Sequence, residues 1–441
     1  MKTTADKRLS SLVGLVSFAI LATPLALAES NNTEQSAPQG EAYYQQIMGA
    51  PPLLPANAEA RWPACEPAVA ADNQQYLTVA ETGTSKGWVE HSAHNWDYFA
   101  AAASAGKVMV IDYARKGDAL AFRYLANEQT HADLYEPWSS SKIMAYSGAL
   151  SLLSENFAQP DTLVGDLKLA DLITSIHSYE VSGEADGNSN AYAYYLANLA
   201  GRDYLTALFH DGWMNISQPQ VKFRGAYGPA AYAPVDDFWR TPSRHVVGQF
   251  PARKQDPGSL SYRCEQCGLT GNKPMTTLAS AEFLKRLVTH KREPATQLPG
   301  LSDDAVMMLL YGPGHSANSA DAGGMMAGAS LMPHRAVAAA LQALQPELEG
   351  LSPQQVLDQA TNGNWRIFHK LGAGPSETRG TSEVVALAHI CLPLADGTRE
   401  FTVAAQASVD GNNYENVGHA GAKLEQLLNQ SVQELLTNPA K

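Results

Sequence analysis

Long apolar runs are scarce in this 441-residue chain. Only residues 12–27 form one, and they follow Lys2, Lys7 and Arg8 and end in the small-x-small pattern Ala26-Leu27-Ala28. This arrangement predicts a cleaved secretory signal peptide over residues 1–28. No later apolar stretch approaches the roughly 18 residues that a membrane span requires. We therefore expect a secreted or periplasmic protein without a membrane span.

Basic residues are also in short supply, with 31 Lys and Arg against 44 Asp and Glu and a formal net charge of −13. An acidic exported chain is a poor partner for nucleic acid or anionic lipid. We therefore expect no nucleic-acid partner. The charge does not by itself choose a substrate, and the chain is expected to be a monomer.

Cysteine is rare, and its four copies are Cys65, Cys264, Cys267 and Cys391. An even number in an oxidising compartment favours structural disulfides, with three pairings open. The Cys264-x-x-Cys267 stretch could instead be half of a zinc site or a redox pair. A redox pair is expected at a strand-to-helix turn, whereas this stretch lies in a polar, glycine-rich loop, so a structural disulfide is the preferred interpretation.

Internal repeats are absent, and the organisation follows from changes in periodicity. Residues 29–73 are predicted to be an N-terminal linker, and residues 74–441 a single catalytic domain. A hairpin is expected over 107–125 and three strands after 364. Helices are expected at 93–106, 139–153, 167–176, 191–199, 276–288, 302–310 and 414–436.

This order predicts an α+β fold in which a five-stranded antiparallel sheet is built from both ends of the domain, about 88–138 and 364–441, with flanking helices. An inserted all-helical lobe is expected over about 139–363. Residues 202–275 are rich in glycine, proline and aromatics and are interpreted as an insertion with structure of its own.

One short stretch, EPWSSSK, combines a hydroxyl with a lysine at helical spacing. Ser139 and Lys142 are three positions apart, so their side chains share a helix face, and backbone N–H groups at the helix start could stabilise an oxyanion. Lys142 could accept the serine proton if burial or a nearby cation lowers its pKa. The simpler alternative is that Ser139 or Ser140 caps the helix and Lys142 is solvated.

Two further stretches strengthen the catalytic interpretation. In residues 186–201, an Asn188-Ser189-Asn190 turn leads into a helix. In residues 369–380, Lys370 would end a strand, and the glycines that follow would admit a substrate backbone. Arg379 could reach back to bind a carboxylate.

In this order the three stretches resemble the S-x-x-K, S-D-N and K-T-G motifs of the active-site-serine penicillin-recognising enzymes, and most of all class A β-lactamases. The resemblance covers roughly residues 106–201 and 276–441. It implies the β-lactamase and transpeptidase fold, and a β-lactam or a D-Ala-D-Ala-type peptidoglycan peptide as substrate. It implies no cofactor and no metal.

The resemblance also implies roles for individual residues. Ser139 would be the acylated nucleophile, Lys142 its base, and Lys370 a cation beside the nucleophile. Asn190 would hold the substrate amide. The other substrate contacts would come from Asn188, Gly372, Ala373 and Arg379, with the backbone N–H groups of Ser139 and of Gly372 or Ala373 forming the oxyanion hole.

Three departures from the family pattern bear on activity. Asn188 replaces the serine of the second motif, which puts proton relay through that hydroxyl in doubt. Leu371 replaces the hydroxyl residue of the third motif. The Glu-Pro that supplies the deacylating base is absent from residues 202–275: the Glu293-Pro294 pair follows the helix, and the acidic pair Asp236-Asp237 is a weak substitute.

Other interpretations stay open. The stretch GTSKG, residues 83–87, fits the nucleophile elbow of α/β-hydrolases, but its surroundings lack alternating strands and helices. His315 and His369 are the most site-like histidines, although each is better explained by packing. The function could also be a catalytically impaired penicillin- or peptidoglycan-binding module, or an esterase or peptidase on the same fold.

Overall fold

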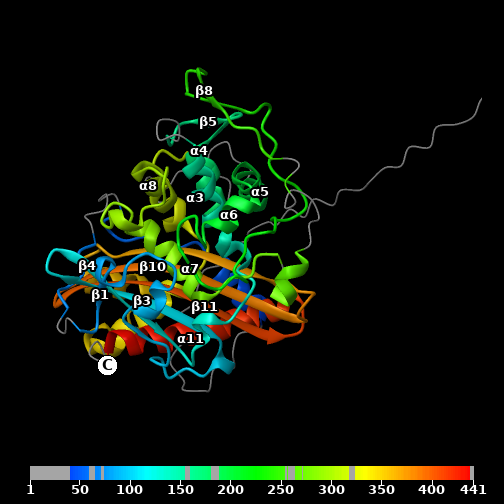
Figure 1. Ribbon diagram of the computed structural model, residues 1–441. Helices are drawn as coiled ribbons and strands as arrows, with labels where there is room; N and C mark the ends of the chain where they lie inside the picture. The colour runs from blue at the N-terminus through cyan, green and yellow to red at the C-terminus, as the bar shows by residue number, and fades with distance from the viewer. Residues whose placement is uncertain are drawn as a thin grey trace, which may run out of the picture. The chain divides into compact units, whose positions relative to one another are not determined.

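The long strands of the chain form one antiparallel sheet built from both ends of the sequence. In the computed structural model, these strands are β3 (Lys107–Lys116), β4 (Ala119–Ala126), β9 (Arg366–Ser376), β10 (Thr381–Leu394) and β11 (Gly397–Asp410). Their order is β4-β3-β11-β10-β9, so the predicted hairpin lies beside the three C-terminal strands (Figure 1). The two-residue strands β1 (Leu77–Thr78) and β2 (His94–Asn95) both pair with β4. The predicted antiparallel sheet is confirmed.

The structure describes residues 40–58, 65–70, 74–153, 159–179, 188–253, 256, 264–270, 272–316 and 323–437. All of these belong to one compact unit, residues 38–441. The predicted signal peptide lies outside the described residues. Within the described ranges, every helix is too short or too polar to cross a membrane.

The two faces of the sheet carry different helices, because alternate residues of a strand point to opposite sides. Met109 and Ile111 of β3 join one core cluster, with the helices α3 (Lys142–Leu152), α4 (Leu169–Ser178), α5 (Ser189–Ala200), α6 (Arg202–Ala207), α7 (Thr277–Val288) and α8 (Asp303–Tyr311) on that side. Val108 and Val110 join the other cluster, which contains α9 (Met332–Leu344), α10 (Pro353–Thr361) and α11 (Tyr414–Thr437). In Figure 1, α11 lies on the opposite side of the sheet from α3, α4 and α8.

This layering changes one predicted boundary. The helical lobe was expected to run to residue 363, but α9 and α10 pack with α11 against the sheet. The sequence pattern did not separate these two helices from the lobe before them, because an amphipathic helix does not encode which surface its apolar face will meet.

Several helices begin where their capping residues predict. The Oγ atoms of Ser302 and Thr276 accept hydrogen bonds from backbone N–H groups in the first turns of α8 and α7. The helix expected at 93–106 is wrong. Trp96 stacks between the rings of His94 and His131, at 4.4 and 3.8 Å, and Phe99 N donates to Ala126 O of β4. These contacts hold the segment in a short strand followed by turns, and only Ala103–Ala105 is helical.

The predicted linker contains a packed segment. The helices α1 (Gly40–Tyr43) and η1 (Tyr44–Met48) lie against α11. A Cβ at Gly418 of α11 would lie 1.6 Å from Gly40 O, so only glycine permits this approach. Tyr43 OH donates to Glu425, 382 residues later. The partner surface is remote in sequence, which is why composition alone predicted a linker here.

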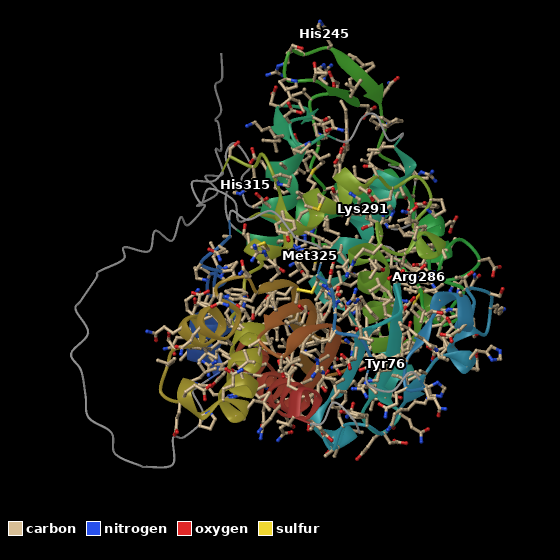
Figure 2. All side chains as sticks on the ribbon, turned by 90° about the vertical axis from the view of Figure 1, so that its left-hand side faces the viewer. Tyr76, His245, Arg286, Lys291, His315 and Met325 are labelled. Atoms are coloured by element: carbon tan, nitrogen blue, oxygen red, sulfur yellow. A yellow bond between two sulfur atoms is a disulfide. The ribbon has the colours of Figure 1, made fainter. Side chains whose placement is uncertain are left out.

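The insertion has structure of its own, as expected. Its strands β7 (Phe238–Arg240) and β8 (Val246–Gln249) join β5 (Leu163–Val164) and β6 (Leu167–Lys168) in a small sheet of order β6-β5-β7-β8. His245, in the β7–β8 turn, lies at the tip furthest from Tyr76 and the large sheet (Figure 2). The remaining short helices are α2 (Val79–Thr82), η2 (Trp88–His91), η4 (Thr130–Ala132), η5 (Trp138–Ser141), η7 (Glu265–Thr270), η8 (Pro294–Thr296), η9 (Gly324–Ala327) and η10 (Pro346–Leu348).

The four cysteines form two disulfides, as predicted. Cys65 pairs with Cys391, which ties an N-terminal segment to β10, and Cys264 pairs with Cys267 at the start of η7. The C-x-x-C stretch is therefore a disulfide that closes a loop of the insertion.

Candidate active site

The turn that carries Ser139 is held in an unusual backbone conformation. Trp138, the residue before it, has φ +50°, a left-handed value that is uncommon for a bulky residue. Its ring lies over β9, where a Cβ at Gly374 would come within 2.5 Å of it, and its Nε1 donates to Glu383 Oε2 at 2.9 Å. These contacts fix η5 (Trp138–Ser141) against the edge of the sheet immediately before α3 begins.

The three consecutive serines are not equivalent. Ser140 and Ser141 are fully buried, and their hydroxyls donate to the backbone carbonyls of Pro137 at 2.6 Å and Trp138 at 2.8 Å. Ser139 is only half-buried, and it lies near enough to the Tyr179 hydroxyl to lower the pKa of that phenol. Of the three, Ser139 is the serine that is not fully buried, and its role as the nucleophile stays a prediction.

Lys142 is fully buried and belongs to a hydrogen-bonded cluster with the second motif. Its Nζ donates to Ser189 Oγ and Asn190 Oδ1, both at 2.8 Å. Ser189 donates its own proton to Ile176 O, so it can only accept from the lysine. A neutral amine has two N–H donors, and these two bonds would use both and leave the lone pair available for a proton.

The electrostatics favour that neutral form. Burial holds the pKa of Lys142 well below its usual range, and repulsion by Lys370 and Lys273 lowers it further. Lys370 is 1% exposed, and burial likewise lowers its pKa. The sequence-based alternative of a solvated Lys142 is wrong.

Tyr179 contacts Lys370 near the nucleophile. Lys370 Nζ lies 2.5 Å from Tyr179 OH and 4.1 Å from the centre of its ring. Burial around the hydroxyl raises the pKa of Tyr179, while the nearby Ser139 acts in the opposite direction. The residue as a whole is 39% exposed and has φ +61° at the end of α4. The Tyr179 hydroxyl donates to Leu371 O at 3.3 Å and accepts from Lys370, so a phenol lies beside the second lysine and near the nucleophile.

Gly372 of β9 lies directly against the nucleophile turn. A Cβ at this position would lie 2.4 Å from Pro137 O and 3.1 Å from Ser139 N. β9 is the last strand of the sheet, with only β10 beside it. The backbone of Gly372 and Ala373 is therefore close to the N–H of Ser139, as an oxyanion hole requires.

Two of the expected substrate contacts have other roles in the structure. Asn188 is the N-cap of α5, where its Oδ1 accepts from Ala191 N at 3.1 Å. The hydroxyl expected to be missing there is supplied one position later by Ser189. Arg379 forms an ion pair with Glu383, so its guanidinium is already bound to a carboxylate.

The acidic residues considered as deacylating bases are engaged elsewhere. Asp236 is paired with Arg240 in the small sheet, and Asp237 follows it there. Glu293 precedes η8 and interacts electrostatically with Lys285 of α7. The buried Glu136 pairs with Lys273 at 3.3 Å. None of these four carboxylates is hydrogen-bonded to Lys142 or Ser139.

Three residues that sequence reasoning missed lie in the cluster: Tyr179, Ser189 and Tyr227. Tyr227 comes from the insertion, and its hydroxyl is 2.8 Å from Ser141 Oγ. Ser189 stands in the quoted motif and could have been recognised by allowing a shift of one residue. Tyr179 and Tyr227 belong to no motif, and only the tertiary structure brings them here.

Three buried histidines lie in the interior near Lys142 and Lys370. His177, His334 and His369 are all buried, and the rings of His334 and His369 are 5.3 Å apart. Burial lowers the pKa of His369 to about 4, with a further contribution from Lys370. His315 lies further along the helical side, in the loop after α8 (Figure 2). The buried histidines add no negative charge to the cluster.

The rival motif and a separate cavity give no comparable site. Gly83 ends α2 and Gly87 precedes η2, so GTSKG is a turn between two short helices and not a strand-to-helix elbow.

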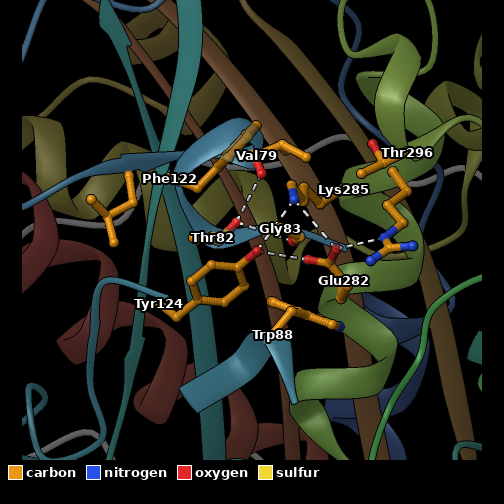
Figure 3. Close-up of a pocket in the computed structure, with 11 residues that line it drawn as sticks. Val79, Thr82, Gly83, Trp88, Phe122, Tyr124, Glu282, Lys285 and Thr296 are labelled. Carbon is orange, nitrogen blue, oxygen red and sulfur yellow. Dashed lines mark hydrogen bonds and ion pairs between the residues drawn. The ribbon is translucent and has the colours of Figure 1, made fainter. Parts of the chain in front are cut away.

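A cavity between β4 and α7 is lined by Tyr124, Glu282 and Lys285 (Figure 3). These polar groups bind one another, because Glu282 accepts from Tyr124 at 2.9 Å and from Lys285 at 3.3 Å.

No protein-family model matches the sequence, and no curated protein matches it. Among solved structures, the chain is similar to the TLA-3 extended-spectrum β-lactamase, with 14% identity, 76% of this chain and 94% of that chain covered, and a TM-score of 0.40. It is also similar to the chromosome-encoded β-lactamase of Vibrio parahaemolyticus, with 11% identity, 77% and 95% coverage, and a TM-score of 0.36.

A third similar structure is PBP-A, with 9% identity, 75% and 90% coverage, and a TM-score of 0.37. Likenesses of this strength assign neither an activity nor a substrate.

Proposed function

We propose that this chain is a serine hydrolase that forms an acyl-enzyme at Ser139. The observation that carries the proposal is a pair of buried lysines in the cluster beside the Ser139 turn, with Lys142 held by Ser189 and Asn190 and Lys370 held by Tyr179. Strongly perturbed basic groups gathered beside a half-buried serine are a mark of a functional site. A purely structural cluster would not leave two lysines in the interior without an acidic partner among the groups that bind them.

The proposed reaction begins with attack by Ser139 Oγ on an acyl carbonyl carbon. The serine proton passes either to the neutral amine of Lys142 or to Lys370 through the Tyr179 hydroxyl, and then to the leaving group. Backbone N–H groups at Ser139 and at Gly372 or Ala373 would stabilise the oxyanion, and Asn190 would contact the acyl side chain. The second step, attack by water, would use the same basic groups, because Asp236, which was considered for it, is paired with Arg240 in the insertion.

The acyl donor in this proposal is a β-lactam or a D-Ala-D-Ala-type peptide, or else an ester or peptide handled by the same residues. Ser189 supports turnover over an impaired binding module, because it restores a hydroxyl beside Lys142. Leu371, buried at 6% exposure, supports a departure from the family's substrates. The two disulfides support folding in an oxidising compartment, hence a secreted or periplasmic protein.

Intact-mass measurement tests the proposal with two donors, benzylpenicillin and p-nitrophenyl phenylacetate. We expect an adduct from at least one of them on the wild type, mapped by peptide analysis to Ser139. Ser139→Ala should carry no adduct, whereas Ser85→Ala, which removes the serine of the rival motif, should carry the wild-type amount. No adduct from either donor on a folded wild type would overturn the proposed function.

A further inference from the structure

The cations around Ser139 are unusual in that, within the described part of the chain, each already has a partner. Arg379 is the one that the sequence offers to a substrate carboxylate. Its Nε donates to Glu383 Oε1 at 2.6 Å, its Nη2 pairs with Glu383 Oε2, and its Nη1 donates to Leu269 O. The two side chains are only 16% and 4% exposed. This two-point pairing is the geometry by which arginine would otherwise bind a substrate carboxylate.

Glu383 is held in place by more than Arg379. Its carboxylate also accepts from Trp138 Nε1 at 2.9 Å and from Thr381 Oγ1 at 3.0 Å. Through Trp138 it is connected to the turn that presents Ser139. A substrate carboxylate would have to displace a buried, fourfold hydrogen-bonded carboxylate, which costs far more than displacing water.

The remaining basic side chains are no more available to a substrate carboxylate. Lys273 pairs with Glu136 at 3.3 Å and donates to Ala226 O at 3.1 Å, and both charged residues are 7% exposed. Lys142 and Lys370 are buried and hydrogen-bonded as described above. Leu371 stands where the family's third motif has a hydroxyl, and it packs in the apolar core.

Resting on the proposed function, we propose that Ser139 is acylated by neutral donors, esters without a carboxylate beside the scissile bond, and that Glu383 determines this specificity by occupying Arg379. Ser139 Oγ bonds to the ester carbonyl carbon, the bond from that carbon to the alcohol oxygen breaks, and the alcohol leaves with the serine proton. Water then attacks the acyl-enzyme: its OH joins the acyl group to give the acid, and its second proton returns to Ser139.

A matched pair of substrates tests this specificity: 3-(phenylacetoxy)benzoate, which has a carboxylate on the leaving group, and its methyl ester, which is neutral. Rates are corrected for the background reaction with hydroxide. For the wild type we expect kcat/KM to favour the methyl ester by at least about tenfold, because the acid gains no cation and must be desolvated. Equal or faster reaction of the acid would overturn the proposal.

Glu383→Gln should release Arg379 while keeping an acceptor for Trp138. We expect the preference for the methyl ester to fall by about tenfold, through faster reaction of the acid. Glu377→Gln is the matched control, because it removes an exposed carboxylate from the same turn, and it should keep the wild-type ratio. An unchanged ratio in a folded Glu383→Gln variant would count against the role of Glu383.

If Glu383→Gln does not fold, Arg379→Gln tests whether Arg379 binds the substrate carboxylate. The proposal expects an unchanged ratio of the two substrates, whereas a carboxylate-binding Arg379 would cause a selective loss on the acid. Failure of the specificity alone is distinguishable from failure of the proposed function: in the first case the phenylacetyl adduct still forms on Ser139 from the acid, and in the second it forms from neither substrate.

Discussion

Two regions of this molecule bury lysine, and they differ in what surrounds it. At α7, Lys285 and Arg286 are 2% exposed and share the carboxylate of Glu282, which Arg286 approaches to 2.7 Å. At the nucleophile, Lys142 and Lys370 are buried as deeply, but their hydrogen bonds go to neutral oxygens. The first cluster balances charge with charge, whereas Lys142 and Lys370 are bound by neutral oxygens, although the charged pair Lys273–Glu136 lies near them.

The pKa shifts follow from this difference. Nearby cations and hydrogen bonds lower the pKa of Glu282 against burial, so it keeps its negative charge and opposes the effect of burial on Lys285. At the nucleophile, burial and lysine–lysine repulsion act together on Lys142. A buried lysine that is paired with a carboxylate keeps its charge and stabilises the fold. A buried lysine that is bound only by neutral groups has a lowered pKa and can act as a base.

The largest effect should come from removing the base or the nucleophile. Ser139→Ala and Lys142→Met should each lower the acylation rate by at least about 10³-fold, because both act in the same step. The unfolding free energy of Lys142→Met should nevertheless stay within about 1 kcal/mol of the wild-type value, because methionine replaces a side chain that is buried in its neutral form. Stopped-flow acylation and urea unfolding measure the two quantities. Substantial residual acylation in Lys142→Met would identify Lys370 as the base.

The charged cluster should show the opposite pattern. Glu282→Gln should lose about 3–5 kcal/mol of unfolding free energy, because it leaves two buried cations without their carboxylate. Glu81→Gln is the control: it breaks the exposed pair with Lys116 and should cost less than about 1 kcal/mol. If the two variants are equally stable, the comparison between the clusters fails.

Acid should lower the free energy of unfolding, because His369 and His177 are buried in their neutral form. The native pKa of His369 is about 4, below the unfolded value of 6.5, so the native state stays unprotonated while the unfolded state gains a proton. Stability is then fully present above pH 6.5 and is lost as pH falls toward 4, by on the order of 3 kcal/mol. His177 adds to this loss in the same direction. Urea unfolding at pH 7 and pH 4.5 measures it, and His369→Gln should lose less than the wild type over the same interval.

The smallest effect concerns the phenol. Tyr179→Phe removes the hydroxyl beside Lys370 and near Ser139 and should slow acylation by about 10²-fold, the usual contribution of one positioned proton-transfer group. Folding stability should change little, because the ring and its stacking on Lys370 are kept. An unchanged rate would mean that the proton of Ser139 passes only through Lys142.

The fold was predictable where its signals are local. The alternation in residues 107–125 and in the C-terminal strands predicted the sheet, and Ser302 marked the start of α8. The packing of Gly40–Met48 was not predictable, because it depends on a groove that Gly418 opens at the other end of the chain. The surfaces against which α9 and α10 pack, on α11 and the sheet, are likewise remote from these helices in sequence.

The site was predictable as far as its motifs reach. Ser139, Lys142, Asn190, Lys370 and Gly372 lie together in the structure. Tyr179 escaped because a tyrosine at the end of a helix carries no pattern that points to a site. Arg379 carried a signal that we did not use: Glu383, four residues further on, lies across the same turn of the hairpin and binds it.

The most direct test of the difference between the two clusters is the protonation of Lys142 itself. In protein labelled with ¹³C-lysine, the side-chain resonance absent from Lys142→Met can be assigned and followed with pH by NMR. We predict a titration midpoint well below the ordinary value of 10.5. A midpoint at or above 10.5 would show that Lys142 is charged at neutral pH, and would contradict its role as the base for Ser139.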